Sequence, residues 1–89
     1  MTTTIITKDV AAHVLSHYNH GGHEGGSFTT ALIALIAKAD LLNRAKLEQA
    51  FPDYVAAVEL AANTPGGIDF LKDLTTDPSI LLGAVRDPA

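Results

Sequence analysis

Apolar residues recur along most of the chain at the three- and four-residue spacing of an amphipathic α-helix. The first such stretch follows Thr7, a suitable N-cap, and extends to about Tyr18. Further helices are expected at 28–39 after a Ser27 cap, 41–50 after an Asp40 cap, 52–62 and 65–74 each opening on a proline, with a last turn or two at 78–82. This pattern predicts an all-α fold, a compact bundle of four to five short helices forming one domain over residues 1–89.

The segments between and beyond these helices have a different character. Residues 1–6 are rich in β-branched side chains and carry no cap, so we expect an extended arm. Residues 19–26 read NHGGHEGG, and each glycine costs a helix about 1 kcal/mol relative to alanine. A Gly/His-rich loop therefore follows the first helix, and the end of the chain, 84–89, is expected to be a loose tail.

The distribution of apolar positions also predicts which helix is central. The helix at 28–39 is apolar around most of its circumference, which is typical of a helix surrounded by others. The expected core consists of Leu32, Leu35, Ile36, Val55, Val58 and Leu71. In the helix at 41–50, the expected inward side chains are Leu41, Leu42, Ala45, Leu47 and the following Phe51, with Arg44, Lys46 and Glu48 facing water.

The charge, the absence of cysteine and the length of the apolar runs argue against several classes of function. The chain has 10 acidic and 6 basic residues and a formal charge of −4, which disfavours nucleic acid as a partner because phosphate binding needs clustered Lys and Arg. It has no cysteine, which excludes disulfide scaffolds and thiolate zinc sites and suits a reducing cytoplasm. The longest apolar run, 31–37, is far shorter than the roughly 20 residues of a membrane span, so no membrane partner is expected.

Histidines supply the one cluster of candidate metal ligands. His13 and His17 are four residues apart on the first predicted helix, so both imidazoles can project in the same direction. His20 or His23, from the glycine loop, would be a third ligand for zinc, nickel or copper. The simpler interpretation treats these histidines as ordinary boundary and solvated residues, because structural zinc sites usually include cysteine. We accordingly expect no cofactor.

No pattern in the chain indicates catalysis. The loop at 22–27 leads into a helix N-terminus, but no strand precedes it and the lysine of a phosphate-binding loop is missing. Ser16 and His17 are neighbours on a helix and point in different directions, which is unsuitable for a catalytic pair. A small DNA-binding regulator stays an alternative, although Arg44 and Lys46 are the only basic residues of the helix at 41–50.

Three segments carry a resemblance to a family of small proteins. They are GGSFTTALIALIAKAD at 25–40, NRAKL at 43–47 and FPDYVAA at 51–57, about a third of the chain together. In these residues the chain resembles an uncharacterised α-helical family of actinobacterial phages and their hosts. The resemblance implies a phage accessory protein acting inside the bacterial cell, in the cytoplasm, and it implies no catalytic residues.

These observations favour a non-enzymatic protein that acts by protein–protein interaction or by self-association. The chain has more apolar helix surface than so short a domain easily hides, and oligomerisation is a usual remedy. We expect a homodimer or a protein partner from phage or host, with Ile5, Ile6, Phe51 and Tyr54 in the interface. The alternatives are a histidine-based metal-binding regulator and a small DNA-binding regulator.

Overall fold

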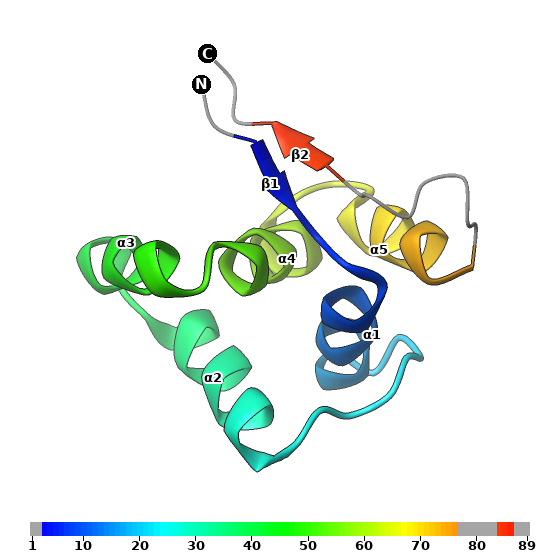
Figure 1. The fold of residues 1–89 in the computed structure, drawn as a ribbon, viewed down its shortest axis with the longest axis horizontal. Helices are drawn as coiled ribbons and strands as arrows, with labels where there is room; N and C mark the ends of the chain where they lie inside the picture. The colour runs from blue at the N-terminus through cyan, green and yellow to red at the C-terminus, as the bar shows by residue number, and fades with distance from the viewer. Residues whose placement is uncertain (1–2, 77–83, 87–89) are drawn as a thin grey trace.

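The helices predicted from the sequence form a small all-α bundle. A computed structural model describes residues 3–76 and 84–86 of the chain (Figure 1). Over these residues the order of elements is β1 (Thr3–Ile5), α1 (Lys8–His17), α2 (Ser27–Lys38), α3 (Leu41–Ala50), α4 (Pro52–Asn63), α5 (Gly67–Thr76) and β2 (Ala84–Arg86). The Cα radius of gyration is 12.0 Å, and a compact domain of this length has about 12 Å.

The core lies where α1, α4 and α5 pack against one another. α2 lies against α1 and α4, whereas α3 packs mainly against α4 (Figure 1). The core side chains are at most 6 % exposed: Ile6, Val10, Ala11, Val14, Leu15, Leu32, Ile33, Ile36, Val55, Ala57, Val58, Leu71 and Leu74. Among the described residues no polar or charged side chain is buried, so burial of apolar surface stabilises this core.

The helix starts follow the predicted capping chemistry closely. The Thr7 side chain accepts a hydrogen bond from the Val10 amide, and the Asp40 carboxylate accepts one of 2.8 Å from the Asn43 amide. α4 opens with Pro52, whose missing amide hydrogen costs nothing in a first turn. Two starts differ from the prediction. α2 starts one residue earlier, at Ser27, and its N-cap Gly26 supplies no side-chain hydrogen bond, whereas α5 starts at Gly67 and not at Pro65.

The extended arm is a strand rather than a free segment. β1 pairs with β2 antiparallel, with Thr4 opposite Val85, so residues 84–86 are not part of a loose tail. The physical reason is that an isolated strand leaves its backbone amides and carbonyls unpaired, and a second strand satisfies them. Residues 87–89, and the helical turn predicted at 78–82, lie outside the described residues.

The expectation that α2 is the central helix is wrong. Leu32, Ile33 and Ile36 of α2 are buried, but Leu35 is 46 % exposed and does not belong to the core. The outer face of α2 stays open because α3 turns away at Ala39–Asp40 to pack on α4 instead of covering α2. α4 is the helix that packs against all four others, and α1 buries the largest number of residues, five.

The loop between α1 and α2 folds back onto α1. Asn19, Gly21 and Gly22 all have positive φ, a conformation that glycine adopts without steric cost. Gly22 also lies directly against the Ala12 carbonyl, where a Cβ atom would come within 2.1 Å of the oxygen. The glycines therefore serve a close approach of loop and helix, which accounts for their density in the sequence.

Candidate protein-interaction surface

Four of the five large apolar side chains that are exposed among the described residues lie on α2 and α3, and the fifth, Ile5, lies on β1. Phe28 is 67 % exposed, Leu35 46 %, Leu41 87 % and Leu42 69 %, and we call these four residues the α2–α3 surface. The inward orientation predicted for Leu41 and Leu42 is thus wrong. α3 has no buried residue at all, and it presents to α4 the side occupied by Arg44 and Leu47. Exposed apolar surface of this kind usually marks a site of contact with another molecule.

A groove runs along the elbow between the end of α2 and the start of α3. Its volume is about 430 Å³, and it is lined by Leu35, Lys38, Ala39, Asp40, Asn43, Lys46 and Leu47. Apolar side chains form much of the lining, and the two lysines supply its positive charge. The Asp40 carboxylate already accepts the Asn43 amide hydrogen as the cap of α3.

Contacts with α4 and α2 hold α3 in place beneath its open face. The Arg44 guanidinium donates to the Glu59 carboxylate of α4, which also accepts from the Asn63 amide. Leu47 and Phe51 pack against the edge of the core, and the Phe51 ring lies 6.0 Å from that of Phe28. A surface anchored in this way is preorganised, so a partner would lose little free energy in ordering it.

The interface predicted from the sequence lies only partly at exposed positions. Ile5, in β1, is 51 % exposed, but Ile6 is fully buried in the core and cannot contact a partner. Phe51 and Tyr54 are half-buried against the core. Ile6 is buried because the chain turns between β1 and α1 and places this side chain in the core. The pattern of apolar residues in so short an arm does not show which of its side chains is buried.

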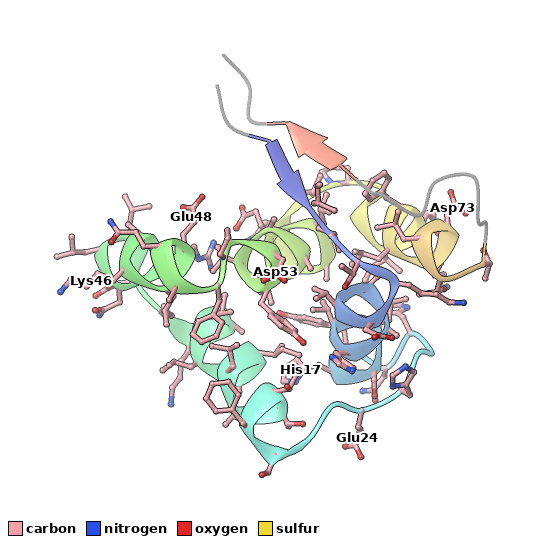
Figure 2. All side chains as sticks on the ribbon, in the orientation of Figure 1. His17, Glu24, Lys46, Glu48, Asp53 and Asp73 are labelled. Carbon is pink, nitrogen blue, oxygen red and sulfur yellow. The ribbon has the colours of Figure 1, made fainter. Side chains whose placement is uncertain are left out.

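The four histidines do not form a ligand set in this structure. His13 and His17 line a small cleft of about 160 Å³ together with Glu24 (Figure 2 labels His17 and Glu24). The His13 and His23 rings lie 5.2 Å apart, edge to face. His20 is exposed on the loop, and the His17 ring packs against Tyr18. Within residues 3–76 and 84–86, no group of three or more His, Asp or Glu side chains is arranged to hold a metal ion.

His13 instead links α1 to α4. Its Nδ1 atom shares a hydrogen bond of 2.9 Å with the Tyr54 hydroxyl, and the two rings are nearly parallel. Burial raises the pKa of Tyr54, and the side chain of Thr29 opposes this effect. Burial likewise raises the pKa of Tyr18, against the opposing charge of Arg44. Both tyrosines pack against the core, and burial favours their neutral phenol form, which is consistent with a structural role.

Sequence reasoning missed the residues that now form the candidate surface. It assigned Leu35, Leu41 and Leu42 to the interior, and it gave Lys38 and Lys46 no role. A usable signal existed, because the apolar positions of α3 do not form one continuous stripe: Leu41 and Leu42 fall on one side of the helix and Leu47 on another. A helix with apolar residues on two sides can bury one side within its own domain and leave the other side exposed.

None of the helices in the described part of the chain has the length and hydropathy that a membrane crossing requires. Comparison with protein-family models, with curated proteins and with solved structures gives no match, so the α2–α3 surface itself must carry the functional argument.

Proposed function

We propose that this protein is a non-enzymatic interaction module that binds another protein chain through the α2–α3 surface. The observation that supports the proposal is the concentration of exposed Phe28, Leu35, Leu41 and Leu42 on two neighbouring helices. Each CH₂ group moved out of water contributes about 0.8 kcal/mol, so covering these side chains favours association. Their neighbours Lys38, Lys46 and Glu48 form a polar rim, which is the usual anatomy of a transient interface.

The resemblance of 25–40, 43–47 and 51–57 to small phage and host proteins suggests where such a partner occurs. We infer an accessory protein of the phage type, acting in the cytoplasm of a bacterial host on a phage or host protein. The first of these segments includes Phe28 and Leu35, whereas Leu41 and Leu42 lie between the first segment and the second, so the resemblance and the exposed apolar residues overlap in part. Self-association through this surface is the alternative form of the same proposal.

Site-specific photo-crosslinking in cells tests the proposal directly. A photoreactive amino acid replaces Leu42 in one variant and Lys72, an exposed residue of α5, in a matched control. We expect ultraviolet light to give a discrete adduct with a protein from position 42 and none from position 72. An adduct of twice the 9.3 kDa mass would identify the partner as a second copy.

The control at position 72 shows which crosslinking results would contradict the proposal. If position 42 gives no more adduct than position 72, although circular dichroism shows that both variants are folded, then the surface is not a protein-binding site. Adducts of equal yield from both positions would likewise contradict the proposal, because they would report random encounters.

A further inference from the structure

The groove at the α2–α3 elbow differs in charge from the molecule that bears it. Its rim carries the ammonium groups of Lys38 and Lys46, whereas the chain as a whole has a formal charge of −4. The one ion pair between described residues joins Arg44 to Glu59, so neither lysine of the rim has a carboxylate within salt-bridge distance.

The acidic residues near the groove offset only part of the lysine charge. Asp40 lines the groove with one carboxylate against the two ammonium groups, and it caps α3 through its bond to the Asn43 amide. Glu48 follows Lys46 by two positions, about 200° around the helix, and Figure 2 shows the two side chains on different sides of α3. The groove is therefore a positively charged, partly apolar site on an acidic protein.

We propose that this groove receives an amphipathic helix of a partner protein whose apolar stripe is flanked by carboxylates. The inference rests on the proposed interaction function and adds the chemistry of the partner. Leucine-sized side chains would contact Leu35, Ala39 and Leu47, and carboxylates beside them would reach Lys38 and Lys46. The net charge of −4 repels acidic segments elsewhere, so the two lysines direct such a helix to this groove.

A helix fits this site better than an extended segment does. Extended peptides are bound mainly by adding to the free edge of a sheet, where backbone amides and carbonyls are available. The groove lies where α2 ends and α3 begins, so it offers side chains and a few backbone groups of helix ends, but no sheet edge to which an extended chain could add. A helix presents apolar residues at three- and four-residue spacing with charged residues beside them, which matches an apolar floor between two lysines.

Two synthetic helical peptides test this inference in a fluorescence anisotropy titration. They share one leucine stripe and differ only in the flanking residues, which are glutamate in one peptide and lysine in the other. We expect the full-length protein to prefer the glutamate peptide by about tenfold at low ionic strength, and to lose most of this preference at 1 M salt. The Lys38→Glu/Lys46→Glu variant should reverse the preference, whereas Lys72→Glu should leave it unchanged.

The outcomes separate this inference from the proposed function. If both peptides bind with equal affinity and Leu35→Ser abolishes their binding, the partner is not selected by its acidic residues, but the proposed interaction surface is retained. If neither peptide binds and the wild-type protein has a mass of twice 9.3 kDa in sedimentation equilibrium, the inferred acidic helix is wrong and the groove binds a second copy of the chain. A preference that survives in Lys38→Glu/Lys46→Glu would place the peptide elsewhere on the protein and overturn this inference as well.

Discussion

At the scale of single residues, two consecutive side chains of α2 have opposite environments. Ile36 is fully buried in the core, whereas Leu35 is 46 % exposed. The sequence alone makes them equivalent, because both are aliphatic residues on a helix that is apolar nearly all round. Which of them is buried depends on where the neighbouring helices lie, and no local pattern in α2 contains that information.

Truncating these two neighbours gives the first prediction. Ile36→Ala should lower the free energy of unfolding by about 2–5 kcal/mol, because it leaves a cavity in a filled core. Leu35→Ala should lower it by less than about 1 kcal/mol, since much of that side chain already lies in water. Urea denaturation followed by circular dichroism measures both. Equal losses in the two variants would show that Leu35 is covered in solution.

The tyrosines predict how stability depends on alkaline pH. The pKa values of Tyr18 and Tyr54 are raised above 10.0 in the folded chain, mainly by burial. Each group therefore binds its proton more tightly when folded, and this contribution to stability is complete below about pH 10 and is lost as pH rises through the folded-state pKa. The free energy of unfolding should fall with rising pH above 10. The fall should be shallower in Tyr18→Phe/Tyr54→Phe, and an unchanged slope would contradict the assignment.

At the scale of elements, the sequence predicts helix starts best where a single residue determines them. Thr7, Asp40 and Pro52 mark the starts of α1, α3 and α4 because capping is chemistry within a single turn. The pairing of β1 with β2 could not be predicted in the same way, because these strands lie at opposite ends of the chain. The exposed face of α3 was missed for a similar reason, since its packing partner α4 had to be known first.

The element scale also decides how the histidines behave toward metal. α1 and its following loop bring the His13 and His23 rings together, but the Nδ1 atom of His13 shares a hydrogen bond with Tyr54, and the described residues supply no third donor arranged for a metal ion. We expect zinc at 100 µM to leave the melting temperature unchanged. A site of micromolar affinity would instead add about 2.7 kcal/mol, which raises the melting temperature of so small a domain by roughly 10 °C or more. A rise that disappears in His13→Ala/His17→Ala would contradict this prediction.

At the scale of the whole molecule, the arrangement is a sealed core with one open flank. α1, α4 and α5 bury their apolar sides against one another, and three exposed leucines lie on α2 and α3. A bundle could be predicted from the periodicity, but which of its sides stays uncovered is a property of the assembled helices. The sequence pattern predicts the apolar excess at Ile5, Ile6, Phe51 and Tyr54. Of these, Ile6 is buried, Phe51 and Tyr54 are half-buried against the core, and Ile5 is exposed.

The open flank makes a last prediction about stability and association together. Leu41→Ser/Leu42→Ser should change the free energy of unfolding by less than about 0.5 kcal/mol per residue, because neither side chain is covered within the chain. The same variant should lose the crosslinked adduct and, where the wild type associates with itself, sediment at the monomer mass of 9.3 kDa. A neutral effect on folding combined with loss of binding would assign both leucines to contact with a partner. A variant that unfolds would instead place both leucines in the core and remove the open flank.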